Sequence, residues 1–357
     1  MEQMETMETR ERTGAQAAGH DFIEVSHLKR YFPIRRGVFS RVSGYVRAVD
    51  DVSFSIRKGE ILGLVGESGC GKSTTGKTML CLQEATGGSM RYDGTTVFDV
   101  EKGVATRGQE MQRLRRSMQI IFQDPYASLD PRKTIGYIVT EGILKHKLAA
   151  SRREALEQAK EMLERCGIPA NSVQKYPHEF SGGQRQRIGI ARSLVLRPSF
   201  IVGDEPLAAL DASIQSQVLT LLQDLVESFH LTTLFISHDL GVVKYFCDRI
   251  AVMYLGSLVE IGTSEQVFGN PQHPYTQALI SAIPAPMPGR AGKRIILAGD
   301  IPSPANPPSG CKFHTRCPYA RPECSEAAPE QRTMDGGHAV WCHLCRGCLL
   351  YTSDAAD

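Results

Sequence analysis

The stretch that decides the fold is Gly66-Glu67-Ser68-Gly69-Cys70-Gly71-Lys72-Ser73. It follows an apolar run of strand length, Ile61–Val65, and fits the pattern GxxxxGK(S/T). Such a loop between a strand and a helix wraps backbone N–H groups around phosphate oxygens, and the positive end of the helix adds to the attraction. It therefore predicts a phosphate-binding loop, in which Lys72 supplies charge to the β- and γ-phosphates and the Ser73 hydroxyl ligates Mg²⁺. The residues expected around the nucleotide are Gly66, Ser68, Gly69, Cys70, Gly71, Lys72, Ser73 and Thr74.

A pair of adjacent carboxylates supplies the second half of this chemistry. Asp204 and Glu205 follow the apolar strand predicted at Phe200–Val202. A strand that ends beside a phosphate loop delivers Asp204 to the Mg²⁺ shell, and Glu205 is then placed to polarise an attacking water. An Asp-Glu pair alone is weak evidence, but in this position after a phosphate loop it indicates nucleoside triphosphate hydrolysis.

Composition and charge narrow the class of protein. The chain has 357 residues, of which 41% are hydrophobic and 22% charged, values that suit a large globular core with an appendage. Its net charge of +2 shows no basic field for nucleic acid. No apolar run reaches the roughly 18–20 residues of a membrane span, and the start has no signal-peptide pattern. We therefore expect a soluble protein that reaches a membrane only through a partner.

The order of strands and helices predicts an α/β fold with a parallel sheet. Strands are expected at Phe22–Phe32, Val46–Ile56 and Thr233–Ser237, with a basic loop at Pro33–Tyr45. Helices are expected at Ser213–Phe229 and, with an apolar face, at Arg152–Arg165. The expected division is a disordered start over 1–20, a core domain over 21–265 with a helical subdomain at about 124–197, and a cysteine-bearing extension over 266–347.

One further string points to a family. Phe180-Ser181-Gly182-Gly183-Gln184 resembles the signature of the ABC ATPases, with Phe180 in place of the usual leucine. It stands before an apolar helix, so it forms a second helix N-terminus that can hold a γ-phosphate. Because the chain already has one phosphate cradle, the resemblance implies that Ser181, Gly182, Gly183 and Gln184 serve a nucleotide held by another subunit. Two ATP would then be sandwiched between two ATPase domains.

Other motifs of the ABC family follow in order. Gln123 resembles the Q-loop residue that touches Mg²⁺ and water, Asp211 resembles the D-loop aspartate, and His238 resembles the switch histidine that contacts the γ-phosphate. Phe32, with Tyr31 as the alternative, resembles the aromatic residue that stacks on adenine.

The ABC resemblance implies a fold and a set of roles. The implied fold is that of a P-loop NTPase, with a parallel-sheet core, an antiparallel β subdomain and a helical subdomain. The implied catalytic set is Glu205, His238 and Gln123, and the implied Mg²⁺ ligands are Ser73, Gln123 and Asp204.

Segments outside these motifs indicate a subfamily. Asn270–Leu279 and Pro302–Cys311 resemble segments of the ATPases of oligopeptide, dipeptide and nickel importers, and Pro33–Tyr45 and Gln123–Arg132 resemble the F-type ATPase of the dipeptide systems. The resemblance implies a peripheral ATPase on the cytoplasmic face of the inner membrane that powers the import of peptides, with nickel or an oligosaccharide as alternatives. The implied partners are a second, different ATPase subunit, two transmembrane permease subunits and, indirectly, a solute-binding protein, without nucleic acid.

Two other interpretations stay open at this point. A non-transport ABC ATPase of DNA repair, ribosomes or regulation usually carries two cassettes, coiled coils or basic arms, and this chain shows one cassette without them. A metal-binding regulatory module with a merely structural cassette is disfavoured by the complete set of Lys72, Glu205 and His238.

Cysteines crowd the end of the chain. With no export signal we expect a reducing compartment, which favours a metal over disulfides. Four thiolates in one small segment can bind a 4Fe–4S cluster or zinc. The importer resemblance favours a 4Fe–4S cluster on Cys311, Cys317, Cys324 and Cys342, with zinc or free thiols as alternatives and a structural or redox-sensing role.

Both ends of the chain call for care. Residues 348–357 match what a common transposon-derived sequencing adapter encodes in one frame, so we expect an artefactual end and leave Cys348 out of the ligand set. Met4 and Met7 are alternative starts.

Overall fold

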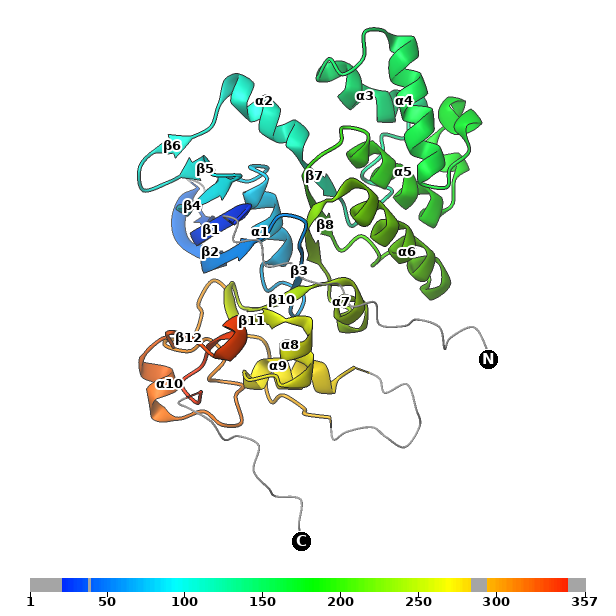
Figure 1. The fold of residues 1–357 in the computed structure, drawn as a ribbon. Coiled ribbons are helices and arrows are strands. Elements are labelled where there is room, and N and C mark those ends of the chain that lie inside the picture. The colour runs from blue at the N-terminus through cyan, green and yellow to red at the C-terminus, as the bar shows by residue number, and fades with distance from the viewer. Residues whose placement is uncertain (1–20, 38–39, 284–293, 346–357) are drawn as a thin grey trace, which may run out of the picture.

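A computed structural model describes residues 21–37, 40–283 and 294–345 of the chain (Figure 1). The expectations for residues 1–20 and 348–357 lie outside these ranges. The strands are β1 (Ile23–Arg36), β2 (Arg41–Ile56), β3 (Ile61–Val65), β4 (Gly87–Tyr92), β5 (Thr95–Asp99), β6 (Val104–Ala105), β7 (Met118–Ile121), β8 (Phe200–Asp204), β9 (Thr232–Ile236), β10 (Arg249–Tyr254), β11 (Ser257–Thr263), β12 (Gln331–Thr333) and β13 (Ala339–Trp341). The α-helices are α1 (Lys72–Met79), α2 (Gly108–Ser117), α3 (Ile135–Lys145), α4 (Arg152–Arg165), α5 (Gly182–Leu194), α6 (Ala212–Phe229), α7 (Leu240–Phe246), α8 (Ser264–Gly269), α9 (Pro274–Ser281) and α10 (Pro322–Glu326), and the 3₁₀ turns are η1 (Ala170–Gln174), η2 (Pro177–Glu179) and η3 (Asp335–Gly337).

The larger sheet carries the nucleotide motifs. Its strand order is β12-β13-β11-β10-β3-β9-β8-β7, and the five strands from β10 to β7 run parallel, as the sequence predicted. Successive residues of β3 enter different cores. Leu62 and Leu64 join the core shared with the smaller sheet, whereas Ile61 and Val65 join the core under the helices. Burial on both faces explains why β3 reads as a continuous apolar run.

The smaller sheet is antiparallel, in the order β2-β1-β4-β5-β6. The prediction of a loop at Pro33–Tyr45 is wrong. Strands β1 and β2 continue through this segment as one long hairpin, in which Pro33 lies opposite Tyr45 and Ile34 opposite Gly44. Strand β4 pairs with β1 only as far as Lys29. One side of β1 is therefore unpaired at Pro33, so the missing N–H of the proline breaks no ladder there.

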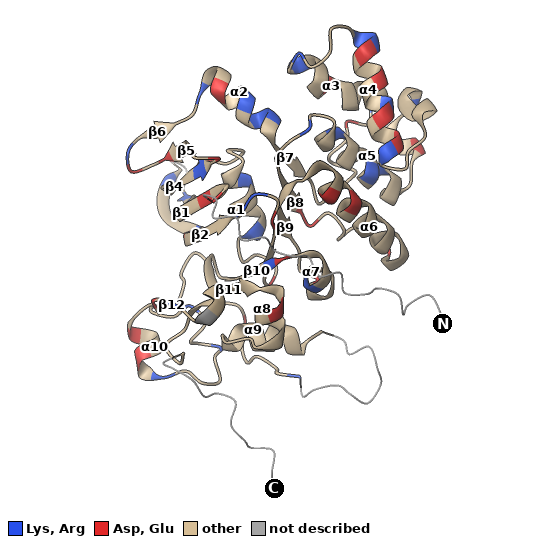
Figure 2. Ribbon diagram, in the orientation of Figure 1, with Lys and Arg blue, Asp and Glu red and all other residues tan. Residues whose placement is uncertain are grey.

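Helices α3, α4 and α5 lie between β7 and β8 in the sequence. Helix α4 matches the predicted bounds, and its apolar face buries Ala155, Ala159, Met162 and Leu163. Ser151 caps it, because its side chain accepts a hydrogen bond from the N–H of Glu154. Acidic and basic residues are interspersed along the length of α4 (Figure 2), so this helix carries no surface of a single charge.

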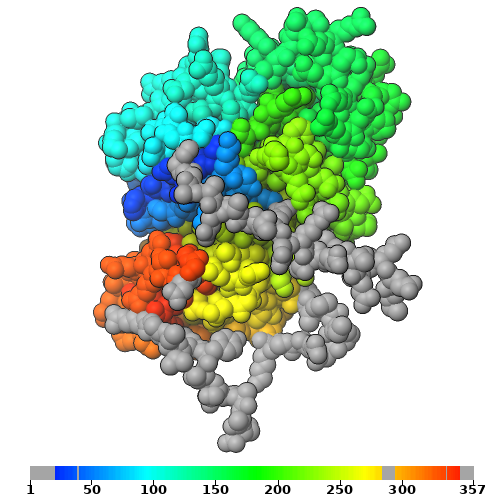
Figure 3. Space-filling model, viewed as in Figure 1, coloured from blue at the N-terminus to red at the C-terminus, as the bar shows by residue number. Residues whose placement is uncertain are grey.

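The C-terminal extension continues the larger sheet. Strand β13 pairs antiparallel with β11, with Val340 opposite Glu260. Glu260 is fully buried, and its carboxylate lies 2.7 Å from the Nε2 atom of His338 and accepts the N–H groups of Gln272 and His273. In Figure 3 the extension, orange to red, meets the blue surface of the first two strands. Sequence patterns alone gave no sign that the extension adds strands to the sheet.

Candidate active site

The phosphate loop joins β3 to α1, and its shape depends on glycines. Gly66 has φ 150° and Gly71 has φ 106°. A Cβ at Gly66 would lie 2.1 Å from the carbonyl oxygen of Met253, and one at Gly71 would lie 2.1 Å from that of Ala48. Both positions therefore need glycine, for conformation as well as for space. The loop is thus closely packed against Met253 and Ala48, and its N–H groups are the candidates to bind phosphate.

Lys72 is the first residue of α1 and is almost fully buried, with 4% of its surface exposed. Its Nζ atom donates to the carbonyl oxygens of Gly66, at 2.8 Å, and Glu67, at 3.1 Å. The ammonium is thus held against the loop backbone, in reach of the phosphates the loop would bind. Neighbouring Cys70 is buried too, and burial raises the pKa of its thiol.

Asp204, at the end of β8, is contacted by two side chains of α1, Ser73 and Lys77. Ser73 Oγ donates to Asp204 Oδ1 at 2.5 Å, and Lys77 Nζ lies 3.1 Å from Oδ2. Hydroxyl and carboxylate oxygens are hard ligands, so Ser73 and Asp204 fit Mg²⁺. Lys77 was missed by sequence reasoning. Its spacing of four residues from Ser73 puts both on one face of α1, and this was the available signal.

Glu205 lies between two other expected catalytic residues. Gln123 Nε2 donates to Glu205 Oε2 at 3.0 Å, and His238 Nδ1 lies 3.1 Å from the same oxygen. Glu205 has φ 47°, an uncommon conformation for a residue other than glycine and one that often occurs at functional sites. A hollow beside it is lined by Glu205, Gln215, Ser237 and His238 among others. Glu205 and His238 therefore border a space where water could be polarised, and Gln123 holds Glu205 by its hydrogen bond.

The signature residues form a separate helix N-terminus. Ser181 caps α5: its hydroxyl accepts the N–H of Gln184, and the Gln184 side chain accepts the N–H of Ser181. Gly183 packs against Ile214 of α6, and a Cβ there would lie 2.4 Å from that side chain. Asp211 stands at the start of α6 and is exposed. Figure 1 shows α5 and α1 on different sides of β7 and β8, so the helix that follows the signature lies apart from the helix that follows the phosphate loop.

The candidate adenine-stacking residues lie on β1. Phe32 pairs with Val46, two residues before Ala48, whose carbonyl lies next to Gly71. This register places Phe32 opposite the strand segment that passes next to the phosphate loop, and the Arg30 guanidinium lies 4.4 Å from the centroid of its ring. The Tyr31 hydroxyl instead donates to Asp50, and burial together with this bond raises the pKa of Tyr31 to about 12. Phe32 is thus the less constrained of the two rings.

The expected cysteine ligands lie in one region. Burial raises the pKa of the Cys311 thiol to about 11, and the nearby thiols of Cys342, Cys324 and Cys317 raise it in the same direction. In the described part of the chain, however, no group of three or more His, Cys, Asp or Glu side chains is arranged to hold a metal ion. Cys345, which is not among the four expected ligands, hydrogen-bonds Cys342 and lowers the pKa of that thiol to about 7. Cys345 is therefore an additional candidate in this region.

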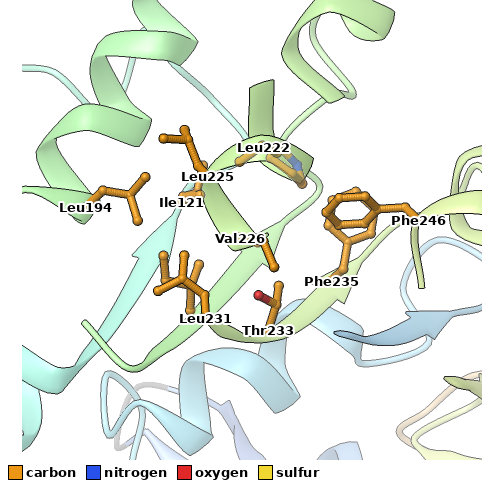
Figure 4. A pocket seen from close by; sticks show the side chains of 12 residues that line it. Ile121, Leu194, Leu222, Leu225, Val226, Leu231, Thr233, Phe235 and Phe246 are labelled. Carbon is orange, nitrogen blue, oxygen red and sulfur yellow. The ribbon is translucent and has the colours of Figure 1, made fainter. Parts of the chain in front are cut away.

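A separate apolar cavity lies between the helices and the ends of β7, β8 and β9 (Figure 4). Leu222, Leu225, Leu231 and Phe246 line it, with Thr233 as its polar member. It offers no charged group to a nucleotide, so we assign it to the packing of the core. None of the helices that the structure describes has the length and apolar character to cross a membrane.

Comparisons with known proteins agree with this geometry. Residues 49–208 match the ABC transporter family, and residues 259–324 match the oligopeptide/dipeptide transporter C-terminal region. The chain is 50% identical to the oligopeptide transport ATP-binding protein AppF of Bacillus subtilis, over 90% of this chain and 97% of that protein. It is 53% identical to a putative peptide import ATP-binding protein of Brucella ovis, over 84% of this chain and 92% of that one.

A solved structure shows the same fold. It is an ATP-binding cassette determined as a dimer in a post-hydrolysis state with ADP and Pi, with a TM-score of 0.59, 26% identity, and coverage of 68% of this chain and 98% of that one. These matches favour a transporter ATPase over the non-transport alternative. The chain therefore belongs to the ABC transporter family, among the ATP-binding, ATP-hydrolysing subunits that carry the oligopeptide/dipeptide transporter C-terminal region.

Proposed function

We propose that this chain powers the import of peptides by hydrolysing ATP at the site built from Lys72, Ser73, Asp204 and Glu205. The observation that carries this assignment is the position of Glu205, which is held by Gln123 and His238 and follows directly on the residue bonded to Ser73. The phosphate loop, the candidate Mg²⁺ ligands and a candidate base thus occur together at the ends of adjacent parallel strands. The printed names of the two relatives above support peptide as the solute.

Each side chain has a role that follows from its contacts. The loop N–H groups and Lys72 bind the phosphates, and Phe32 stacks on adenine. Ser73, Asp204 and Gln123 would hold Mg²⁺, which neutralises charge on the β- and γ-phosphates when bound. Both hydrogen bonds to Glu205 reach Oε2, so we assign Oε1 to accept a proton from the attacking water. His238 orients Glu205 and contacts the γ-phosphate.

A second subunit completes the site. Ser181, Gly182, Gly183 and Gln184, with Asp211 beside them, present an exposed helix N-terminus that we assign to the ATP of a partner ATPase. We propose that this partner is a different ATPase, and that two permease subunits anchor the pair on the cytoplasmic face of the inner membrane, where a solute-binding protein supplies peptide. We also propose the division into a cassette over 21–265 and an extension over 266–347.

A transport assay tests the assignment of peptide. Membranes holding the chain with its co-purifying permeases are reconstituted with the solute-binding protein, and phosphate release is measured with a peptide mixture, Ni²⁺ or an oligosaccharide. Peptide should stimulate hydrolysis in the wild type and not in Glu205→Gln. Stimulation by Ni²⁺ or the oligosaccharide alone would replace the solute and leave the ATPase assignment standing.

We also propose a 4Fe–4S cluster, or zinc as the alternative, on Cys311, Cys317, Cys324 and Cys342. The support is their mutual proximity in the extension, and side chains must shift for three or more thiols to meet one ion. Anaerobically purified protein should absorb near ~400 nm and contain about four irons per chain. Cys311→Ser should abolish both signals, whereas Cys81→Ser, remote in sequence, should keep them. One zinc and no colour would change the metal, and neither metal would remove the proposal.

A further inference from the structure

The turn between Cys311 and Cys317 is firmly seated on the cassette. Phe313 at its centre is 1% exposed, and its ring centroid lies 5.2 Å from that of Tyr254 on β10 and 5.5 Å from that of Tyr275 on α9. This aromatic cluster fixes the turn, so that Lys312 and Arg316 on either side of Phe313 extend to defined partners.

Arg316 reaches the phosphate loop. Its Nη1 donates to Glu67 Oε2 at 2.8 Å and its Nη2 to Oε1 at 3.3 Å, and only 8% of the Arg316 side chain is exposed. The backbone N–H of Glu67 donates to the Tyr275 hydroxyl at 2.8 Å. Glu67 is the second residue of the phosphate loop, so both its main chain and its side chain are held by residues beyond the cassette.

The ion pair also affects the charge at the loop. Glu67 carries a carboxylate next to the place where a triphosphate must bind, and like charges repel there. Arg316 neutralises this carboxylate through a two-point contact, a geometry that a lysine cannot reproduce. Removing Arg316 would therefore both loosen the loop and leave an unpaired negative charge beside the phosphates.

Lys312 contacts residues near the strand that carries the candidate adenine-stacking ring. Its Nζ lies 2.8 Å from Asp50 Oδ2 and 2.7 Å from Ser257 Oγ, and the same Asp50 accepts the hydroxyl of Tyr31. Tyr31 precedes Phe32 on β1, so Lys312 supports the strand that carries the candidate adenine-stacking ring. A third contact, from the Arg47 N–H to the Pro304 carbonyl at 2.9 Å, ties the extension to β2.

We propose that the turn Cys311–Cys317 is a positioning element of the nucleotide site, in which Arg316 with Tyr275 sets the phosphate end and Lys312 sets the base end. This inference rests on the nucleotide site proposed above. It extends that site by residues about 240 positions beyond the phosphate loop and gives the C-terminal extension a part in binding ATP.

Calorimetric titration of the full chain with MgATP and with magnesium tripolyphosphate tests the proposal, because tripolyphosphate has no base. Arg316→Met should lower the affinity for both ligands about tenfold, and Arg316→Lys should lower it less. Glu67→Gln combined with Arg316→Met should recover part of the loss, because the like charge is gone; a purely structural role of Arg316 predicts no recovery. Lys312→Met should lower the affinity for MgATP about fivefold and leave the affinity for tripolyphosphate unchanged.

Control variants separate the possible failures. Arg165→Met and Lys102→Met remove exposed ion pairs elsewhere and should bind both ligands as the wild type does. Thermal unfolding without ligand shows whether each Met variant is folded. If one is not, Tyr275→Phe, which removes only the hydroxyl that holds Glu67, should still lower the affinity for both ligands. Lys72→Ala should lose tripolyphosphate binding, and wild-type binding by this variant would overturn the nucleotide site itself. If Lys72→Ala loses tripolyphosphate binding while the Arg316 and Tyr275 variants keep wild-type affinities, only the positioning role is overturned.

Discussion

His238 Nδ1 lies 3.1 Å from Glu205 Oε2, although the two residues belong to different strand ends. Glu205 follows β8 and His238 follows β9, and these strands are parallel neighbours in the sheet. Their carboxyl ends therefore open at the same edge, where the loop after β7 adds Gln123. These contacts are thus a direct result of the order of strands in the sheet.

Replacement of Glu205 by glutamine should separate binding from hydrolysis. The amide keeps the size of the side chain but cannot take a proton from water, so turnover should fall on the order of 10²–10⁴-fold while MgATP still binds. Phosphate release and ATP retention by the assembled transporter measure the two effects. Glu161→Gln, on the exposed surface of α4, is the matched control. Wild-type turnover in Glu205→Gln would remove this residue from the role of base.

Lys72→Ala and Ser181→Arg should damage different sites of a two-ATPase complex. Lys72 lies against its own phosphate loop, whereas α5, which begins after Ser181, lies on the other side of β7 and β8 from α1. The test uses mixed complexes in which one subunit is altered, and photo-crosslinked ATP reports which chain binds the nucleotide. Lys72→Ala should abolish ATP crosslinking to the altered chain, whereas Ser181→Arg should abolish ATP crosslinking to its partner. Loss on the altered chain in both cases would contradict the shared site.

Gly71→Ala should destabilise the protein more than Gly103→Ala. Both glycines have positive φ, 106° and 67°, which costs an alanine roughly 1 kcal/mol. A Cβ at Gly103 meets nothing within 4 Å, whereas one at Gly71 would lie 2.1 Å from the Ala48 carbonyl. The free energy of unfolding, measured with denaturant and without nucleotide, should thus fall further for Gly71→Ala. Equal losses would show that the loop moves away from β2 at little cost.

Acid should destabilise the chain through His273. Burial lowers the pKa of this imidazole to about 4, below the ordinary value of 6.5. Above pH 6.5 the group is neutral in both states; as the pH falls from 6.5 towards 4, only the unfolded state takes up the proton, so stability is lost over this window. His273→Asn keeps an acceptor for the Tyr275 N–H but does not titrate.

The two proteins should therefore respond differently to pH. Between pH 7 and pH 4.5 the wild type should lose roughly 2–3 kcal/mol more unfolding free energy than His273→Asn. Denaturant titrations at both pH values measure this difference. Parallel losses in the two proteins would assign the acid sensitivity to other groups.

The sequence by itself determined the nucleotide chemistry of this protein. The glycine loop Gly66–Ser73, the strand ending in Asp204 and the helix start at Ser181 are local features, whose geometry follows from residue types over a few positions. For this reason β3 and α4 have the bounds predicted for them. The strand–helix alternation likewise predicted the parallel sheet.

Only the tertiary structure decided which distant residues support that chemistry. Arg316 and Glu67 are separated by 249 positions, and neither has a local pattern that names the other. The pairing of β13 with β11 and the long hairpin of β1 and β2 were likewise not foreseen. The physical reason is that such contacts depend on which surfaces the packed core leaves within a few ångströms of each other, and one sequence does not encode that distance locally.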